Sequence, residues 1–146
     1  MRIDHMTLAE LERAFPDDDA CRAHLVTHRW PRGVRCPRCN SKSVYRHNSR
    51  RWHWECPDCS RGGAYRFSST VGTIFKNSKL PLRSWFRVVH MMTNPNGVRV
   101  MNVYREMSFG SYKAAWRMYY QLRRDLRKRR FLTIMGMIRP GETSPR

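Results

Sequence analysis

Apolar residues recur at helical spacing through the second half of the chain. The segment LPLRSWFRVVHMM (80–92) places Leu82, Trp85, Phe86, Val89 and Met92 on one side of a helix. TNPNG (93–97) ends this pattern with a proline, a glycine and two asparagines. The sequence therefore predicts a helix with one buried face, then a loop, and then a second, shorter helix in VRVMNVYREM (98–107).

A third helix is predicted to begin at Ser111, in SYKAAWRMYYQLRRDLRKRR (111–130). Ser111 is a favourable N-cap, because its hydroxyl can accept a hydrogen bond from an amide of the first turn. The apolar stripe of this helix consists of Ala115, Trp116, Tyr119, Leu122 and Leu126. We interpret Trp116 and Leu122, like Trp85 and Phe86, as core residues. A short helix, a glycine-bearing turn and a longer basic helix are typical of a helix-turn-helix, although any three-helix bundle shows this order.

The first half of the chain follows a different pattern. Three segments alternate between apolar and polar residues and predict short strands: SVYRHN (43–48), RWHWEC (51–56) and AYRFSS (64–69). In the middle one, Trp52, Trp54 and Cys56 share a face. FPDDDACRAHLVTHRW (15–30) predicts a helix, in which we expect Cys21 to be a buried thiol that packs as a small apolar group. The last segment, FLTIMGMIRPGETSPR (131–146), is short and ends in glycine, serine and proline, so we expect a frayed tail.

Four cysteines change this picture. CPRC (36–39) and CPDC (56–59) are matched motifs with sixteen residues between them. This spacing predicts one structural Zn²⁺ held by Cys36, Cys39, Cys56 and Cys59, since two such turns supply the four sulfurs of a closed tetrahedral site. A disulfide pair is disfavoured in a reducing compartment, and a thioredoxin-type site is disfavoured because no βαβ pattern is present. We do not expect His47 or His53 to be ligands, because the four cysteines fill the coordination shell.

The sequence therefore predicts an α+β fold. We expect an N-terminal acidic helical segment (1–32), a four-cysteine zinc ribbon built on a small antiparallel sheet (33–70), a three-helix helix-turn-helix unit (71–130) and a C-terminal tail (131–146). The ribbon has too few apolar residues for a core of its own, so metal binding must supply its folding energy. No segment is long and apolar enough for a membrane span, and the N-terminus lacks the pattern of a secretory signal. We expect a cytoplasmic, nucleoid-associated protein.

Charge identifies the class of partner. The 146 residues include 29 Lys and Arg against 11 Asp and Glu, for a formal net charge of +18. Six of the eleven acids lie in the first 24 residues, so the rest of the chain is still more basic. Such a skew predicts a polyanion, and we expect double-stranded DNA. RNA polymerase or another protein, bound through the ribbon or the acidic N-terminus, is a further predicted partner.

The third helix supplies the predicted DNA contacts. In a helix-turn-helix its first turns lie nearest the base edges, which makes Ser111, Tyr112, Lys113, Ala114 and Arg117 the candidate base readers. The run RRDLRKRR (123–130) could lie on phosphates as a helical extension or as a disordered basic arm, and its predicted contacts are Arg123, Arg124, Arg127 and Lys128.

The order of these motifs resembles a bacterial insertion-sequence transposase family. The likeness covers roughly residues 8–127 and is most specific in the paired cysteine turns, in GTIF…SKLPLR…W (72–85) and in SYKAAW (111–116). Members have a transposase-type zinc ribbon and a helix-turn-helix, followed by an RNase H-like catalytic domain. The resemblance places the zinc ligands on Cys36, Cys39, Cys56 and Cys59 and the DNA-contacting helix from Ser111. Asn40 stands where the family usually has a glycine. This is a small change, because asparagine tolerates the left-handed backbone conformation.

The resemblance does not predict catalysis for this chain. Two-metal strand cleavage needs three carboxylates gathered on one fold. After residue 24 the acids are Glu55, Asp58, Glu106, Asp125 and Glu142, and the sequence ends where the catalytic domain would begin. We therefore expect a non-enzymatic DNA-binding protein derived from a transposase recognition region, acting as a transcriptional regulator or nucleoid-type binder. The alternatives are a truncated transposase remnant that binds transposon ends, and an RNA- or ribosome-associated protein that stacks bases on Tyr45, Trp52 and Trp54.

Overall fold

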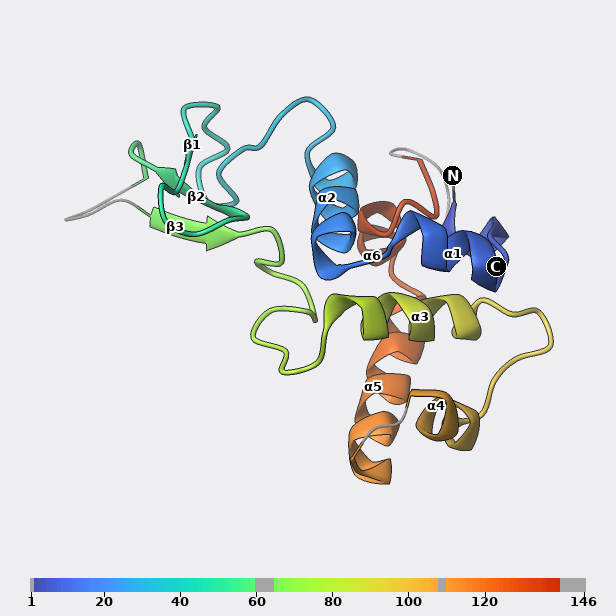
Figure 1. Cartoon of the computed structure of the whole chain (residues 1–146). Helices are drawn as coiled ribbons and strands as arrows, with labels where there is room; N and C mark the ends of the chain where they lie inside the picture. The colour runs from blue at the N-terminus through green and yellow to red at the C-terminus, as the bar shows by residue number, and fades with distance from the viewer. Residues whose placement is uncertain (1, 60–64, 108–109, 140–146) are drawn as a thin grey trace.

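A small sheet and a body of helices make up the molecule. The computed structural model describes residues 2–59, 65–107 and 110–139 (Figure 1). In chain order the elements are a 3₁₀ helix η1 (Ile3–His5), α1 (Leu8–Ala14), α2 (Asp18–Arg29), β1 (Tyr45–Arg46), β2 (His53–Cys56), β3 (Tyr65–Ser68), α3 (Leu82–Met92), α4 (Val100–Met107), α5 (Tyr112–Asp125) and α6 (Arg129–Ile134). The predicted α+β class is confirmed.

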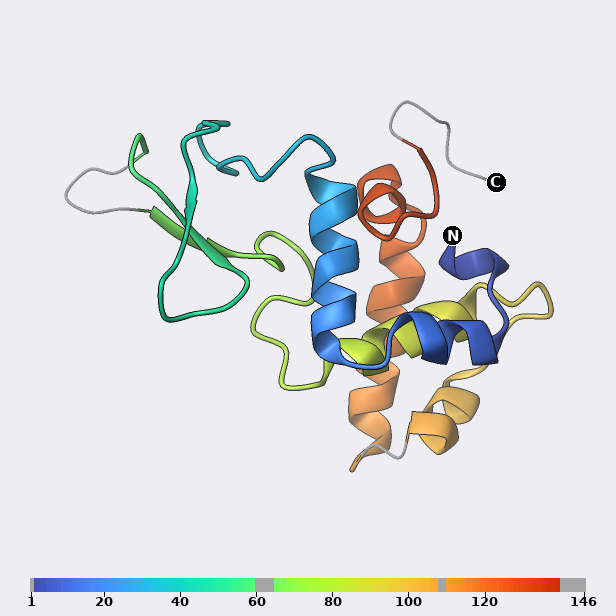
Figure 2. The ribbon, with the colours of Figure 1, turned by 45° about the horizontal axis from the view of Figure 1, so that its top comes forward.

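The three strands form one antiparallel sheet in the order β1-β2-β3. Trp54 lies opposite Phe67 in the register and stacks on it, with ring centroids 6.0 Å apart. Trp30, which follows α2, meets Trp54 edge to face, with ring centroids 6.1 Å apart. This aromatic group is small, as expected for a sheet that needs another source of stability. Figure 2 shows the sheet standing away from the helices, joined to them by residues 30–44 and 69–81.

The helices share one hydrophobic core. Figure 1 shows α3 crossing the body, with α2 and α6 on one side and α4 and the first turns of α5 on the other. Trp85, Phe86 and Val89 of α3 are buried in this core, as their spacing predicted. The N-terminal segment belongs to the same core, because Ile3 and Leu11 are buried in it. None of the described helices is long and apolar enough to cross a bilayer.

Cys21 is fully buried in the core, which confirms the predicted buried thiol. Burial, together with the negative charge of Asp18, raises the pKa of this thiol to about 12. A group with such a high pKa remains a neutral thiol at physiological pH and is a poor nucleophile.

The expectation of a frayed C-terminal tail is wrong for residues 131–138. Helix α6 lies there, and its apolar face packs on α2. The buried residues of this segment are Phe131, Leu132, Met135, Met137 and Ile138. Gly136 has a φ of 72°, and a Cβ at that position would lie 2.6 Å from the Nε2 atom of His28, so a glycine is needed for the close approach. Residues 140–146 lie outside the described part.

The expectation that Trp116 is a core residue is also wrong. Its side chain is 47% exposed, whereas Trp85 and Leu122 are buried as predicted. The face of α5 that meets the core is centred on Ala115, Met118 and Leu122. Trp116 follows Ala115 by one residue, and a helix turns about 100° per residue, so its side chain points away from that face.

Candidate metal centre and nucleic-acid interface

The first cysteine turn is shaped by backbone hydrogen bonds after α2. The amide of Asn40 donates to the carbonyl of Cys36 over 2.9 Å, and the amide of Cys36 donates to the carbonyl of Ser41 over 3.1 Å. Asn40 has a φ of 62°, the left-handed conformation expected for it. The amide of Arg38 lies 3.4 Å from the Cys36 sulfur, a contact typical of a turn that presents thiolates to a metal.

The second cysteine turn begins at the end of β2. Cys56 is the last residue of that strand and is fully buried, and Cys59 is half-buried in the turn that follows. The Ser41 hydroxyl donates to a carboxylate oxygen of Asp58 over 2.5 Å. This bond joins the two turns directly, so that the sheet and the loop hold their sulfurs on the same side.

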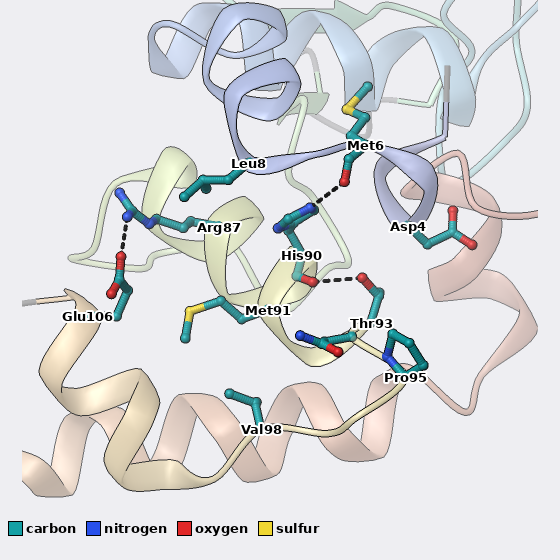
Figure 3. A pocket seen from close by; sticks show the side chains of 11 residues that line it. Asp4, Met6, Leu8, Arg87, His90, Met91, Thr93, Pro95, Val98 and Glu106 are labelled. Atoms are coloured by element: carbon teal, nitrogen blue, oxygen red, sulfur yellow. Dashed lines mark hydrogen bonds and ion pairs between the residues drawn. The ribbon is translucent and has the colours of Figure 1, made fainter.

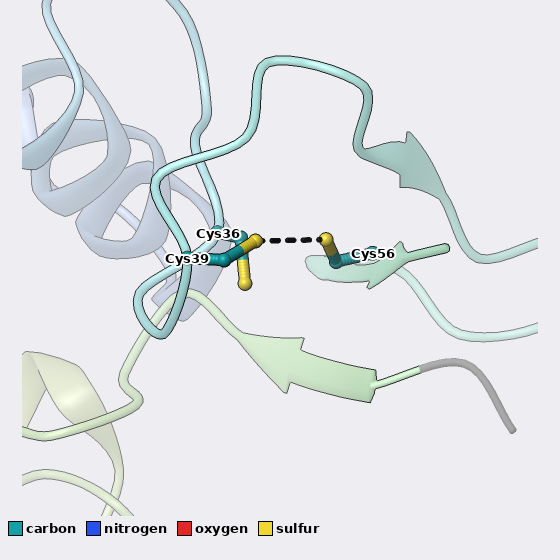
Figure 4. A group of neighbouring side chains, drawn as sticks. All are labelled: Cys36, Cys39 and Cys56. Atoms are coloured by element: carbon teal, nitrogen blue, oxygen red, sulfur yellow. Dashed lines mark hydrogen bonds between the residues drawn. The ribbon is translucent and has the colours of Figure 1, made fainter. Parts of the chain in front are cut away.

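The sulfurs lie at metal-binding distances. The Sγ atoms of Cys36, Cys39 and Cys56 are within 4.8 Å of one another, and those of Cys39 and Cys56 are 3.5 Å apart (Figure 4). A zinc–sulfur bond of ~2.3 Å in a tetrahedron gives a sulfur–sulfur edge of about 3.8 Å. All four cysteines are free thiols. The geometry fits a structural zinc ion and is too open for a disulfide.

The charges in this cluster also suit a metal. Burial raises the pKa of the Cys36 thiol, but hydrogen bonds from the backbone at Cys39 and Arg38 outweigh it and lower the pKa to about 7. Burial and hydrogen bonding to Cys36 raise the pKa of Cys59, whose sulfur lies outside the group of three. The Cys36 thiol therefore ionises near neutral pH. A divalent cation bound there would stabilise the thiolate forms of the other cysteines.

The two histidines of the ribbon are not part of the cluster. The Nε2 atom of His47 lies 3.4 Å from Glu55, which also accepts hydrogen bonds from the Tyr45 hydroxyl (2.6 Å) and from Arg66 Nε (2.7 Å). His53 Nδ1 lies 2.9 Å from the carbonyl of Arg51. Among the described residues, both histidines therefore contact groups other than the cysteine sulfurs, in agreement with the expectation that neither is a ligand.

Of the three ribbon aromatics considered for stacking on bases, Tyr45 is exposed, at 48%. Trp54 is buried, and the indole Nε1–H of Trp52 donates to Asp19 over 2.9 Å. Asp19 also pairs with Arg51 at 2.9 Å, so this carboxylate ties the sheet to α2.

Among the described ion pairs, the acids of residues 4–19 meet Arg2, His5, Arg22, Arg51 and Arg87, none of which lies on α5.

The side of α5 that faces solvent has an unusual composition. We call its exposed residues the α5 outer face: Tyr112, Lys113, Trp116, Arg117, Tyr120, Arg123 and Arg124. Three are aromatic and four are cationic, and none is acidic. The four cations form no ion pair with any described residue. Because excess positive charge repels itself, such a face is suited to a polyanion.

Two predicted base readers have structural roles. The Ser111 hydroxyl accepts a hydrogen bond from the amide of Ala114 over 3.1 Å, which makes Ser111 the N-cap of α5 as predicted. Ala114 is half-buried. Tyr112, Lys113 and Arg117 lie on the α5 outer face, where a ligand could reach them.

The basic run after α5 is ordered rather than a loose arm. Helix α5 ends at Asp125, whose buried carboxylate pairs with Lys128 at 3.1 Å, and α6 begins at Arg129. Arg127 is exposed. The Arg29 guanidinium donates to the carbonyls of Ser69 and Val71, and burial, together with Arg130, lowers its pKa to about 10. Sequence reasoning missed Arg29, because only the packing of α2 on α6 brings it beside the basic run.

A groove of about 500 Å³ lies elsewhere, between the N-terminal segment and the far end of α3 (Figure 3). Met6, Met91 and Val98 provide its apolar wall. The polar groups at its edge mainly meet each other: His90 Nε2 lies 2.7 Å from the Met6 carbonyl, and Arg87 pairs with Glu106. This groove offers no convergent set of reactive groups, so the candidate chemistry lies at the cysteines and on α5.

Comparison with known proteins supports the zinc ribbon. Residues 16–62 match a family model described as a transposase zinc-ribbon domain. The chain is 32% identical over 124 residues to a protein of Halobacterium salinarum described as an uncharacterized protein in transposable element ISH50. That match covers 83% of this chain and 37% of the relative, so the chain spans little more than a third of the relative's length. No solved structure matches the chain.

Proposed function

We propose that this chain is the DNA-recognition part of a transposable-element protein, and that it binds duplex DNA mainly through the α5 outer face. One observation carries the proposal: every exposed residue of α5 is aromatic or cationic. Lys and Arg supply the phosphate contacts that dominate affinity for DNA. The matched transposase zinc-ribbon domain and the transposable-element relative support the same class of function.

We propose further that α3, α4 and α5 act as a helix-turn-helix. Helix α4 packs on α5 and both contact α3, which is the order of that motif. Tyr119 of α5 donates its hydroxyl to the carbonyl of Val98 over 2.9 Å, so the two helices are also linked by a hydrogen bond. In this proposal Lys113 and Arg117 approach base edges, and Arg123, Arg124 and Arg127 approach phosphates.

The zinc ion in this proposal is structural. Cys36, Cys39, Cys56 and Cys59 would fill its coordination shell with four thiolates, which leaves no open position for a substrate. The ribbon would then extend the DNA footprint or offer a docking surface to a protein such as RNA polymerase.

We propose that the residues described here do not cleave DNA. The cysteines form the one group of three or more potential metal ligands within residues 2–59, 65–107 and 110–139. The described carboxylates after residue 24 are engaged elsewhere: Glu55 with Arg66, Asp58 with Ser41, Glu106 with Arg87 and Asp125 with Lys128. Any strand transfer would require carboxylates from another segment or another protein.

Binding to transposon ends is the role we favour. The relative belongs to a transposable element, which supports this role over that of a transcriptional regulator or a nucleoid-type binder. An RNA-binding role would use the ribbon aromatics, and the burial of Trp54 and the hydrogen bond of Trp52 weigh against it.

The salt dependence of duplex binding tests the proposal. If about six phosphates are contacted, log affinity should fall with log salt at a slope near −5. Arg123→Ala and Arg124→Ala should each weaken binding and reduce the slope by about 1. Lys113→Ala and Arg117→Ala should each weaken binding and relax sequence specificity. Lys79→Ala removes the same charge from an exposed position outside α5 and should change none of these quantities. A slope near zero, or equal effects of Lys79→Ala and Lys113→Ala, would contradict the proposal, as would tighter binding to duplex RNA.

A further inference from the structure

Three aromatic rings form a line along the middle of the α5 outer face. We call Tyr112, Trp116 and Tyr120 the aromatic stripe; their side chains are 44%, 47% and 42% exposed. They recur every four residues, so the stripe runs about 12 Å along the helix. Large aromatic side chains usually bury most of their surface, and three exposed in a row mark a surface that meets a partner.

The rings are held in place by their neighbours. Tyr112 meets Tyr104 of α4 edge to face, with centroids 5.7 Å apart. Trp116 and Tyr120 lie 4.7 Å apart, and Tyr120 also contacts Tyr119 at 5.1 Å. Since Tyr119 is fixed by its hydrogen bond to Val98, the stripe rests on an ordered support. A prepositioned surface loses little conformational entropy when it binds.

The charges beside the stripe indicate what it binds. Lys113 and Arg117 each follow a stripe residue by one position and lie along one side of it, and Arg123 and Arg124 lie one turn beyond its end, with no exposed acid on the helix. An apolar protein partner would have to desolvate these cations without pairing them, which is costly. Aromatic rings flanked by cations are the combination with which proteins bind the bases and the backbone of unpaired nucleic acid.

The chemistry of the rings favours unpaired bases over base-pair edges. Readout in the major groove requires hydrogen-bonding groups, and the indole of Trp116 offers a single donor. Its principal surface is the ring face, which can stack on the π-face of a base. In an intact duplex the base faces are stacked on one another, and they become available only where the strands separate.

We infer that the aromatic stripe stacks on unpaired bases, so that the chain prefers DNA with locally separated strands to intact duplex. This inference rests on the proposed function and adds the form of DNA that is bound. At ~3.4 Å per nucleotide, a stripe of about 12 Å could accompany three or four bases of one strand. Arg123 and Arg124 would follow the phosphates of the same strand.

Three DNA probes of one sequence test the inference: a blunt duplex, a fork with unpaired arms and the single strand. Fluorescence anisotropy at one salt concentration measures affinity for the zinc-loaded full chain. We expect the fork to bind more tightly than the duplex. Trp116→Ala should remove about tenfold of that preference, because the fork supplies an unpaired base on which the ring can stack and the duplex does not. Tyr120→Ala should act in the same direction, and Trp116→Phe should retain the preference.

Arg124→Ala is the matched control, because it lies on the same face but carries charge rather than a ring. It should weaken binding to the three probes by a similar factor. Equal affinity of the wild-type chain for fork and duplex would overturn the stacking inference and leave the proposed function intact, as would an equal loss on both probes in Trp116→Ala. Conversion of a dimer to a monomer by Trp116→Ala in sedimentation would overturn it too, by assigning the stripe to self-association. Failure to bind any probe would overturn the proposed function itself.

Discussion

At the scale of single residues, His24 has a strongly perturbed environment. Its Nε2–H donates to the carbonyl of Met135 over 2.7 Å, a contact between α2 and the segment after α6. Its ring also lies 5.2 Å from that of Phe15 and 4.2 Å from that of His28. Burial lowers the pKa of His24 to about 4, although the hydrogen bond to Met135 acts in the opposite direction.

This environment predicts a pH-dependent stability. The unfolded chain protonates His24 near its usual pKa of about 6.5, whereas the native state resists protonation until about pH 4. Between these values the unfolded state binds more protons, so stability falls as the pH is lowered. We expect the contribution of His24 to be complete above pH 6.5 and to decrease by roughly 2–3 kcal/mol as the pH approaches 4. Denaturant unfolding followed by circular dichroism measures it.

His24→Gln is the control for this prediction, because glutamine can keep a donor near Met135 but does not titrate. Acid also protonates cysteine thiolates and releases metal, in wild type and variant alike. The difference between their two pH profiles therefore isolates His24. Parallel profiles between pH 7 and 4 would show that the histidine is not protected in the native state.

At the scale of secondary-structure elements, α6 shows how a short helix can stabilise a larger body. It has only six residues, too few to be stable alone, and it depends on packing against α2. Phe131 anchors it, with a ring 5.9 Å from Phe75 and 6% of its surface exposed. The α6 segment is therefore part of the core rather than an appendage.

Phe131→Ala should destabilise the protein by about 3–5 kcal/mol, because it leaves a cavity where the ring was. Tyr120→Ala provides a comparison, since it removes an aromatic ring of similar size from an exposed position on α5. We expect that change to lie within about 0.5 kcal/mol of wild type. Chemical denaturation of both variants measures the difference, and equal values would mean that α6 does not belong to the cooperative core.

At the scale of the whole molecule, the ribbon and the helical body have different sources of stability. The buried cluster of the body contains none of Cys36, Trp54, Cys56 or Phe67. The sheet therefore depends on the metal and on a few links to α2, such as Asp19 to Trp52. The body depends on the burial of apolar side chains around α3.

Removal of zinc should consequently unfold one part and spare the other. A chelator is expected to eliminate the dispersed amide resonances of residues 33–59 and 65–70, while those of α3, α5 and α6 persist. Metal analysis should find one zinc per chain in the untreated protein. Cys59→Ser should reproduce the effect of the chelator, whereas Cys21→Ser should keep the full metal content. Unfolding of the whole chain by the chelator would show that the two parts are thermodynamically coupled.

The sequence alone was sufficient for properties that depend on local spacing. Paired cysteine turns require only a few residues of chain to place their sulfurs together, so the cluster of Cys36, Cys39 and Cys56 was predictable. The same holds for the helix of Trp85 and Phe86 and for the cap at Ser111, since helical periodicity and capping act within a few turns.

The tertiary structure decided which sides of these elements are buried and which distant segments contact one another. Trp116 fits an apolar stripe by its spacing, yet α3 and α4 cover the neighbouring side of α5 and leave its ring in solvent. Phe131 begins the segment that was expected to be a frayed tail, yet α2 provides an apolar surface on which α6 packs. Burial depends on contacts between segments distant in the chain, such as that of His24 with Met135, and no local pattern encodes those contacts.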